Sequence, residues 1–423
     1  MKQAEVVIGA NYGDEGKGLF TDHVAAPYGR DALVVRFNGG AQAGHTVTTP
    51  DSPHEKSIHH VFSHFGSGTL TGAATYLSEY FVCNPLLFSK ELHRLREQQV
   101  APLVYADPQC PLTTPYGMMI NQIVEESRGG ARHGSCGVGF GETLERTEKT
   151  SLRLRVGNAA DADFVARTLR IIRTRWVPQR LAALGVTTLP QRWQERLVND
   201  DIIDGYLIAL ENFYRNTIQR DATILCGNQP IVFEGAQGLL LDQDRGAFPH
   251  VTRSHTGLTN VLALAGRAGI DKLNVTYATR AYLTRHGAGP LPGELSAKPY
   301  SAIEDATNVP NDYQGALRFA YLDADILAHA IAADMADANG RVAVRVRLGI
   351  SCVDQLDAAP VLVLGGQPVV LSPADFISTL ALRVGIDDVL ASHGPTRATI
   401  CAMTVKQLGA ATRRQGAGRY QMA

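Results

Sequence analysis

The sequence predicts an α/β fold with a large, mostly parallel central sheet flanked by helices and a P-loop-like phosphate site. A hydrophobic run at 5–9 enters a glycine-rich loop and then a helix, and a second strand at 33–37 follows at β-α-β spacing. Polar, glycine-rich turns also end several of the expected strands. In open α/β sheets, ligands bind where the carboxyl ends of the strands meet, so these turns are the expected site.

Composition limits the class of protein. The chain has 423 residues, a formal net charge of −1 and a hydrophobic fraction of 45%, which are typical of a globular α/β protein. We therefore expect no nucleic-acid partner. No apolar stretch approaches the roughly 18 residues of a membrane helix, and the N-terminus leads directly into a strand, so we expect neither a membrane partner nor a signal peptide. The six cysteines form no C-x-x-C pair, which favours reduced thiols and a cytoplasmic location.

The other elements follow from periodicity and from turn residues, and together they predict one large catalytic domain over 1–423 with a helical insertion at about 158–222. Two glycine-rich stretches, 128–143 and 284–295, are expected to be irregular, and the chain is expected to close with a strand, a turn and a helix over 386–410. The expected helices are 18–26, 85–98, 160–184, 201–220, 257–267 and 323–336, and the expected strands are 103–105, 231–234, 272–279, 342–348 and 361–364.

The first loop has the composition of a phosphate site. Glycines allow backbone N–H groups to approach an anion, the following helix adds positive potential at its N-terminus, and Lys17 can reach a terminal phosphate. The loop is not a strict Walker A motif, because Asn11 stands where glycine is expected and Gly18 replaces the Ser or Thr that would hold Mg²⁺. Asp14 is the candidate that could hold the metal instead.

Two further turns offer acid–base groups. The turn at 38–46 supplies His45, and the turn after the strand at 231–234 supplies Glu234 and Gln237. A carboxylate and an imidazole brought from separate loops suit general base and general acid roles on one substrate.

These motifs, taken in order, resemble the adenylosuccinate synthetase family. The resemblance rests on GDEGKG at 13–18, QAGHT at 42–46, FEGAQG at 233–238, TRHGAGPLPGEL at 284–295 and SHGPTR at 392–397. It implies a homodimeric ligase of purine biosynthesis that binds Mg²⁺. It also implies that GTP phosphorylates the 6-oxygen of IMP and that L-aspartate then displaces the phosphate to form a C–N bond. The alternative from another class is a nucleotide-binding regulatory protein without catalytic activity.

The resemblance also implies roles for single residues. Asp14 would be the base that removes the N1 proton of the purine and a Mg²⁺ ligand together with the Gly44 carbonyl. His45 would be the acid, and Gln237 would position the purine. With Lys17 these form the expected catalytic set. The expected GTP-binding residues are Gly13, Glu15, Gly16, Lys17, Gly18, Gly44, His45, Thr46, Asp354, Ser392 and Gly394.

The largest departure from the family lies in the loop that binds the amino acid. An arginine-rich run is expected there, but only Arg318 remains, and Asn311 and Gln314 are the other polar candidates. A dicarboxylate favours bidentate guanidinium partners. Either other arginines bind aspartate, or the amine is a different molecule. The candidate replacements are Arg253, Arg280 and Arg285.

The purine site departs as well. The expected purine-binding residues are Asp14, Gln42, Ser135, Cys136, Gln237 and Thr252, of which Gln42 stands for an asparagine and Ser135 and Cys136 for two threonines. A thiol is a poor phosphate donor. Arg132, His133 or Arg146 could compensate, and Arg153 or Arg155 lie near the position from which the family supplies an arginine across the dimer. GMP or dGMP as substrate remains an alternative to IMP. Asp14 argues against the related phage branch that acts on dGMP, in which serine replaces it.

Overall fold

A computed structural model describes residues 1–51, 56–304 and 315–407. Ten strands form the central sheet in the order β18-β17-β14-β9-β1-β8-β2-β5-β6-β7. Every neighbouring pair is parallel except β17 and β18, which confirms the predicted fold class. The strands are β1 Gln3–Gly9, β2 Leu33–Arg36, β5 Ala74–Leu77, β6 Val104–Ala106, β7 Ile218–Gln219, β8 Ile231–Gly238, β9 Lys272–Arg280, β14 Ala343–Ser351, β17 Asp388–Ser392 and β18 Ile400–Thr404.

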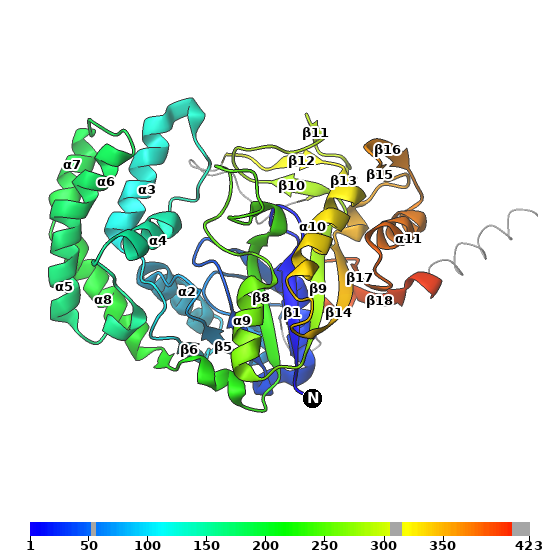
Figure 1. The fold of residues 1–423 in the computed structure, drawn as a ribbon, viewed down its shortest axis with the longest axis horizontal. Helices are drawn as coiled ribbons and strands as arrows, with labels where there is room; N and C mark the ends of the chain where they lie inside the picture. The colour runs from blue at the N-terminus through cyan, green and yellow to red at the C-terminus, as the bar shows by residue number, and fades with distance from the viewer. Residues whose placement is uncertain (52–55, 305–314, 408–423) are drawn as a thin grey trace, which may run out of the picture.

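Helices and three small sheets surround this central sheet (Figure 1). The small sheets are formed by β3 His45–Thr48 and β4 His59–Phe62, by β10 Leu283–Arg285, β11 Glu294–Leu295 and β12 Arg318–Ala320, and by β13 Leu322–Asp323, β15 Val361–Leu364 and β16 Gln367–Val370. The helices are α1 Lys17–Ala25, α2 Pro85–Glu97, α3 Pro115–Arg128, α4 Phe140–Lys149, α5 Ala162–Ile171, α6 Val177–Ala183, α7 Gln191–Val198, α8 Asp201–Arg215, α9 Leu258–Ala268, α10 Ala324–Ala336 and α11 Pro373–Val384.

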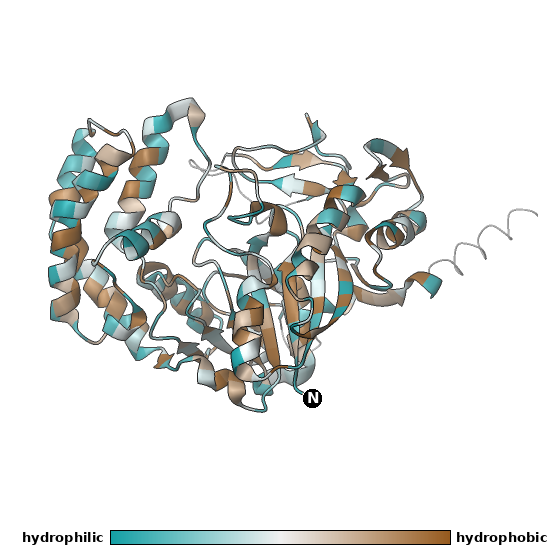
Figure 2. Ribbon diagram, in the orientation of Figure 1, coloured by the Kyte–Doolittle hydropathy of each residue, from teal (hydrophilic) through white to brown (hydrophobic). Residues whose placement is uncertain are grey.

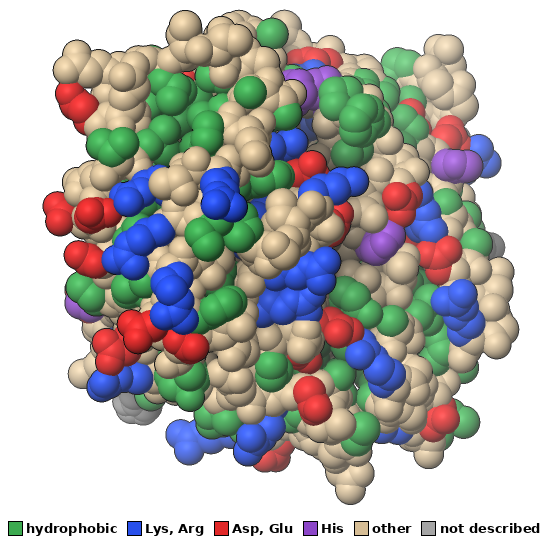
Figure 3. Space-filling view, turned by 60° about the vertical axis from the view of Figure 1, so that its left-hand side comes forward, with side chains coloured by type: hydrophobic (Ala, Val, Ile, Leu, Met, Phe, Trp, Pro, Cys, Tyr) green, Lys and Arg blue, Asp and Glu red, His purple; other side chains and the backbone are tan. Residues whose placement is uncertain are grey.

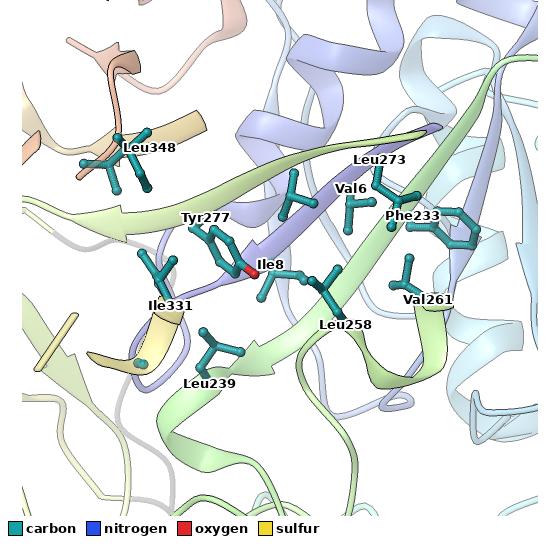
Figure 4. Close-up of a cluster of buried hydrophobic side chains, with 14 of the residues drawn as sticks. Val6, Ile8, Phe233, Leu239, Leu258, Val261, Leu273, Tyr277, Ile331 and Leu348 are labelled. Atoms are coloured by element: carbon teal, nitrogen blue, oxygen red, sulfur yellow. The ribbon is translucent and has the colours of Figure 1, made fainter. Parts of the chain in front are cut away.

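The central strand β1 is buried on both faces, as its continuous hydrophobic run predicts. Val6 and Ile8 point into the cluster that includes side chains of α9 and α10, whereas Val7 points to the opposite face, against Phe20 and Val24 of α1. This alternation is the two-residue period of a strand that separates two helical layers. Figure 4 shows the first of these clusters, and Figure 2 shows hydrophobic colouring on the central strands and mixed colouring on the outer helices.

Between β6 and β7 the chain leaves the sheet for a helical region. It contains the predicted helices within 158–222 but begins earlier, because α3 and α4 precede them. A second buried cluster holds this region to the edge of the sheet, with Phe88 stacked on Phe65 at 5.0 Å and packed edge-on against Phe213 at 4.8 Å between ring centroids. The assignment of the whole chain to one catalytic domain stays a prediction.

Ion pairs join the helices of this region. Arg180 pairs with Glu142 on α4, and Arg192 pairs with Glu126 at the end of α3. Figure 3 shows that on this side of the molecule Lys and Arg side chains lie among Asp and Glu side chains. Among the described residues, no helix is long and apolar enough to cross a membrane.

Four expectations about local structure were wrong. The stretch 128–143 is not wholly irregular, since α4 begins at Phe140. The stretch 284–295 carries β10 and β11 at its ends. The expected strand–turn–helix over 386–410 also omitted the antiparallel strand β18, which follows the turn after β17; residues 405–407 are helical, and 408–410 lie outside the described residues. Residues 235–238 continue β8 with an irregular register, so they do not form a turn. In the β8 case, pairing with the distant strand β1 outweighs the local preference of glycine-rich sequence for a turn.

Candidate active site

A cavity of about 930 Å³ lies where the carboxyl ends of five adjacent strands meet. The loops after β1, β2, β8, β9 and β14 all contribute to it, as expected for an open parallel sheet. Most of the sequence-predicted site residues line it. These are Gly13, Asp14, Gly16, Lys17, Gly18, Gln42, Gly44, His45, Thr46, Ser135, Cys136, Gln237, Thr252, Asp354 and Gly394.

The loop after β1 is braced by Glu15. One carboxylate oxygen accepts hydrogen bonds from the backbone N–H of Asn11 at 3.0 Å and of Gly13 at 2.7 Å, and the other lies 2.7 Å from Nζ of Lys17. Glu15 is buried and does not line the cavity, so its side chain holds the loop and orients Lys17. The glycine at position 18 also has a structural reason, because a Cβ there would lie 2.7 Å from the Thr46 carbonyl oxygen.

Asp14 projects from this loop into the cavity. Its backbone has a φ of 61°, its carbonyl oxygen accepts a 2.5 Å hydrogen bond from Nε of Arg280, and its Oδ2 lies 3.2 Å from Nε2 of His286. Burial alone would raise the pKa of Asp14, but the hydrogen bond and charge of His286, with the charges of Arg280 and Lys17, lower it to about 2. The carboxylate is therefore ionised at neutral pH and ready to accept a proton.

His45 and Glu234 form a buried pair. Nδ1 of His45 lies 2.6 Å from Oε1 of Glu234, and Glu234 also accepts hydrogen bonds from the backbone N–H and the hydroxyl of Ser67. Burial would raise the pKa of Glu234, but the charges of Arg36 and His45 and the bonds from His45 and Ser67 lower it to about 2. Because an ionised carboxylate only accepts, Nδ1 carries the proton. Glu234 is fully buried and absent from the cavity wall, so it orients His45 instead of contacting a substrate.

The other ring nitrogen of His45, Nε2, is buried and has no hydrogen-bond partner within the described part of the chain, and the residue lines the cavity. Burial lowers the pKa of His45 to about 4 despite the opposing effect of Glu234. At neutral pH the ring of His45 is therefore neutral, and Nε2, which carries no proton, is a hydrogen-bond acceptor.

The purine candidates come from several loops. Both amide atoms of Gln42 are buried and have no hydrogen-bond partner among the described residues, which leaves the amide nitrogen as a donor and the amide oxygen as an acceptor. Gln237 has a φ of 66°, and Cys352, also on the wall, has a φ of 61°. With Asp14, three of the four non-glycine residues of positive φ in the described chain therefore line this cavity, and such strain is concentrated at functional sites.

The candidates for the substrate phosphate differ in what they can offer. The Ser135 hydroxyl accepts a 2.7 Å hydrogen bond from Asn121 and keeps its own proton to donate. Burial raises the pKa of Cys136 to about 11, so its thiol is neutral. Thr252 lies on the cavity wall, and its backbone N–H is bound to Leu241.

Of the residues that could replace the missing phosphate ligands, only His133 lines the cavity. His133 lines the cavity, with its ring centroid 5.4 Å from that of His250. Arg146 is buried and donates to backbone carbonyl groups, so it does not compensate at the phosphate. Arg132 lies outside the cavity lining. Arg153 and Arg155 donate to Thr147 and Gln109 and are also absent from it.

The residues expected to bind the guanine base of GTP follow β14 and β17, which lie on the opposite side of β1 from β8 and β2. Asp354, after β14, is exposed in the cavity, and Gly394, after β17, also lines it. Ser392 does not line the cavity, because its hydroxyl donates at 2.7 Å to the Gly394 carbonyl and so fixes the turn.

The remaining arginine of the amino-acid loop is engaged elsewhere. Arg318 makes a two-pronged contact with Glu294, with Nε at 2.8 Å from Oε1, and donates to the carbonyl groups of Gly287 and Gly289 at 2.9 Å each. It does not line the cavity. Asn311 and Gln314 lie outside the described residues.

Comparison with known proteins agrees with this geometry. The family model described as adenylosuccinate synthetase matches residues 6–339. The adenylosuccinate synthetase of Xanthomonas oryzae pv. oryzae is 30% identical over 315 residues, covering 72% of this chain and 68% of the relative, and that of Xylella fastidiosa is 31% identical over 311 residues with the same coverage. The chain belongs to the adenylosuccinate synthetase family. It is accordingly a ligase that forms a C–N bond with the use of GTP.

Two solved structures share the fold of this adenylosuccinate synthetase family member. The fully ligated adenylosuccinate synthetase from Plasmodium falciparum aligns with a TM-score of 0.69 at 18% identity, covering 94% of this chain and 99% of the other. The succinoaminodeoxyadenylate synthetase of cyanophage S-2L, bound to dGMP and to dATP as an energy donor, aligns with a TM-score of 0.61 at 15% identity, covering 98% and 99%.

The sequence reasoning missed His286. It occupies the variable position of the TRHGAGP stretch, and only its histidine side chain in a glycine-rich loop could have drawn attention to it. It also grouped Glu234 with the acid–base candidates, whereas the structure buries this side chain behind His45, and that burial could not be read from a turn motif.

Proposed function

We propose that this protein phosphorylates the 6-oxygen of a purine nucleotide with GTP and then replaces the phosphate by an amine. IMP with L-aspartate is the reference pair that the family relationship supplies. In the first step the γ-phosphorus–oxygen bond of GTP breaks, a bond from phosphorus to O6 forms and GDP leaves. In the second, the amine nitrogen bonds to C6, the C6–O6 bond breaks, inorganic phosphate leaves and the amine gives up a proton.

The observation that carries this proposal is the place of the β1 loop between two groups of candidates. In the sheet order, β14 and β17 lie on one side of β1 and β8 and β2 on the other. The guanine candidate Asp354 follows β14, whereas the purine candidate Gln42 lies in the loop after β2 and Gln237 lies near the end of β8. One loop with Lys17 and Asp14 thus stands between two sites, as phosphoryl transfer between two nucleotides requires.

Asp14 is proposed as the base. An ionised carboxylate inside the cavity can take the N1 proton of a 6-oxopurine, which makes O6 more nucleophilic. Held by Arg280 through its backbone and by His286 through its side chain, it is oriented before the substrate binds.

His45 is proposed as the acid. Its Nδ1–H is held by Glu234, so Nε2 is the atom that faces the reacting groups. The negative charge of bound phosphates favours the imidazolium form, in which Nε2 donates to O6 or to the transferring phosphoryl group.

Asp14 and the Gly44 carbonyl are proposed to hold Mg²⁺. Both residues line the cavity and offer the hard oxygen ligands that this ion prefers, and Gly44 is exposed there. Bound Mg²⁺ would neutralise charge on the phosphates.

Two purine nucleotides are candidates for the substrate. The retained Asp14 favours IMP, since it supplies the base that a 6-oxopurine with N1–H needs. The two unpartnered amide atoms of Gln42 would also suit the additional amino group of a guanine-type nucleotide, so GMP and dGMP are the second candidates.

We also propose that the protein is a cytoplasmic homodimer. Size-exclusion chromatography with light scattering would test the dimer.

The test is a substrate matrix. Purified protein with MgCl₂ and GTP or ATP would be given IMP, GMP or dGMP, with and without amino acids, while phosphate release and product mass are followed. We expect amine-dependent release of phosphate and a product in which nitrogen replaces O6. The absence of such release in every combination would refute the ligase proposal and favour a regulatory nucleotide-binding protein.

A further inference from the structure

We infer that Arg36 is a positioning residue for His45: its charge balances that of Glu234, so that this carboxylate orients the imidazole by a hydrogen bond without holding it protonated before nucleotides bind. The inference deepens the proposed function, on which it rests, by giving a task to a buried cation that the mechanism has not used. Neither Arg36 nor Glu234 lines the cavity, so the arginine acts through the two side chains in front of it.

Strand pairing fixes the position of Arg36. It is the last residue of β2, and its register partner on the neighbouring parallel strand β8 is Glu234. Nη1 of Arg36 lies 4.0 Å from Oε2 of this carboxylate, and Oε1 of the same carboxylate lies 2.6 Å from Nδ1 of His45. A guanidinium, a carboxylate and an imidazole therefore form a chain of contacts that ends at the cavity wall.

The guanidinium group of Arg36 has few other partners. Its side chain and that of Glu234 are both fully buried. Nη1 donates to the Phe65 carbonyl at 3.2 Å, and the group lies 5.3 Å from the ring centroid of Phe81. Nε and Nη2 are buried and have no hydrogen-bond partner among the described residues. Because apolar replacement of a buried ion pair is often neutral or stabilising, stability alone does not explain an arginine in this otherwise apolar strand.

The charges behind His45 explain what the arginine contributes. A single carboxylate beside the ring would favour the imidazolium form, and a cation behind that carboxylate opposes it. Burial lowers the pKa of His45, the charge of Glu234 opposes this effect, and the charge of Arg36 acts in the same direction as burial. An imidazole that is neutral at rest becomes charged only when phosphates bind. Its positive charge is then used on the transferring phosphoryl group and not in the resting enzyme.

The elements packed against His45 bring few other charges. From α1 comes Lys17, whose charge also lowers the pKa of His45. On β4 the register partner of His45 is the uncharged Phe62, and the buried His60 lies 3.8 Å from Glu91. None of these groups is altered in the variants below, so a shift in the titration of His45 reports the substituted cation.

The first test is the titration of His45 in the full-length protein without nucleotide. Histidines labelled with ¹³C at Cε1 are followed by NMR from about pH 5 to about pH 8, and His45→Gln identifies the resonance. We expect His45 of the wild type to stay neutral throughout. In Arg36→Met we expect it to become protonated at the acid end of the range, since removing one nearby cation raises the pKa by about one unit or more.

Two further variants separate charge from packing. Arg36→Lys keeps the charge, and we expect it to restore most of the wild-type titration. Arg146→Met is the matched control, because Arg146 is also buried but donates to the carbonyl groups of Leu152 and Leu112 and pairs with no carboxylate in the part of the chain that the structure describes. It should lower the thermal midpoint and leave the titration of His45 unchanged.

Steady-state kinetics give a second readout that a merely structural role would not produce. We expect Arg36→Met to lower kcat at least about ten-fold, because a more basic imidazole is a weaker acid toward the reacting oxygen. The KM for GTP should be unchanged or lower, since an imidazole that is already charged binds phosphate in the ground state as well. A rise in KM that accompanies the fall in kcat and in the thermal midpoint would indicate a structural role and overturn the inference.

The outcomes for the inference and for the proposed function differ. A wild-type His45 that is protonated at neutral pH without nucleotide would overturn the inference, and this measurement needs no variant. An unchanged titration in Arg36→Met, or an equal shift in Arg146→Met, would overturn it too. None of these results depends on turnover, whereas the proposed function fails only if the wild type shows no amine-dependent release of phosphate.

Discussion

Nε2 of His286 lies 3.2 Å from Oδ2 of Asp14, although the two residues are far apart in the sequence. His286 belongs to the loop after β10, while Asp14 follows β1. The contact gives the carboxylate a fixed direction and a partner that favours its ionised form. A base that is oriented before substrate binds needs less reorganisation during the reaction.

Replacing His286 tests whether this contact orients Asp14. We expect His286→Phe to lower kcat by about 5- to 30-fold, the loss of one charge-assisted hydrogen bond, with a smaller change in KM for the nucleotide. His286→Gln keeps an N–H donor and should recover part of the rate. Steady-state kinetics with the best substrate pair measure both. An unchanged kcat in His286→Phe would show that the contact is incidental.

The matched change in Asp14 removes the base itself. We expect Asp14→Asn to lower kcat by at least about 1,000-fold, because the amide is almost isosteric but cannot accept the proton. Nucleotide binding, followed by calorimetry, should survive. Turnover near the normal rate would mean that another group is the base.

Glu234→Gln should reduce turnover although the residue touches no substrate. The amide of Gln can donate a hydrogen bond to Nδ1 of His45. The neutral ring would then carry its proton on Nε2, the opposite tautomer to that in the wild type. By analogy with such pairs elsewhere, kcat should fall by at least about 100-fold. His45→Ala should fall at least as far, and the double variant should fall no further than the larger single loss. Additive losses would refute the idea that the pair works as one unit.

Lys17→Met should weaken GTP binding. The ammonium group is the only cation of the β1 loop, and we expect the KM for GTP to rise more than about ten-fold, since a charge-assisted bond to phosphate is lost. Lys90 on α2 is exposed and away from the cavity, so Lys90→Met is the control. Equal KM values in the two variants would remove Lys17 from the phosphate site.

Gly134→Ala should separate two loops that line the cavity. Gly134 has a φ of 80°, and a Cβ there would lie 2.4 Å from the Cα of Gly287. We expect the KM for the purine nucleotide to rise and the thermal midpoint to fall, because backbone must move to relieve the contact. Gly130→Ala is the control, since a Cβ at that position meets nothing within 4 Å. Identical behaviour of the two variants would contradict the close approach of the loops.

Glu91 links stability to pH. It is buried and accepts hydrogen bonds from the backbone N–H groups of Ser63 and His64 at 2.9 Å and 2.8 Å and from the Ser63 hydroxyl at 2.5 Å. Burial alone would raise its pKa, but contacts with His60, His64 and Ser63 lower it far below its ordinary value of 4.5. Its contribution to the free energy of unfolding is therefore complete above pH 4.5 and is lost as the pH falls toward the folded pKa.

Glu91→Gln should therefore destabilise the protein by about 2–3 kcal/mol at neutral pH. The difference from wild type should narrow below pH 4.5, because only the wild type loses stability through this group. Urea unfolding at several pH values measures it. Glu97→Gln is the control, since its pair with His93 on the same helix is mostly exposed and should contribute less than about 0.5 kcal/mol. A pH-independent difference for Glu91→Gln would refute the linkage.

The sequence was sufficient where chemistry and local pattern coincide. The hydrophobic run of β1, the glycines after it and the spacing to β2 predict a parallel sheet with a phosphate loop, and the motifs place Asp14, Lys17, His45 and Gln237 at one site. All four line a single cavity, because parallel strands bring the loops after their carboxyl ends to the same edge. Motif order was enough to name the family.

Only the tertiary structure decided what each charged side chain does. Glu15, Glu234 and Arg318 stand in or beside recognised motifs, yet the fold turns them toward a backbone loop, a histidine and another carboxylate. His286 comes beside Asp14 only because β9 lies next to β1 in the sheet. A motif fixes residue types along the chain. The direction of a side chain and its burial depend on how the chain packs around it, whether the neighbours are close in sequence, as for Glu15, or distant, as for Glu234, so these roles could not be read from the sequence.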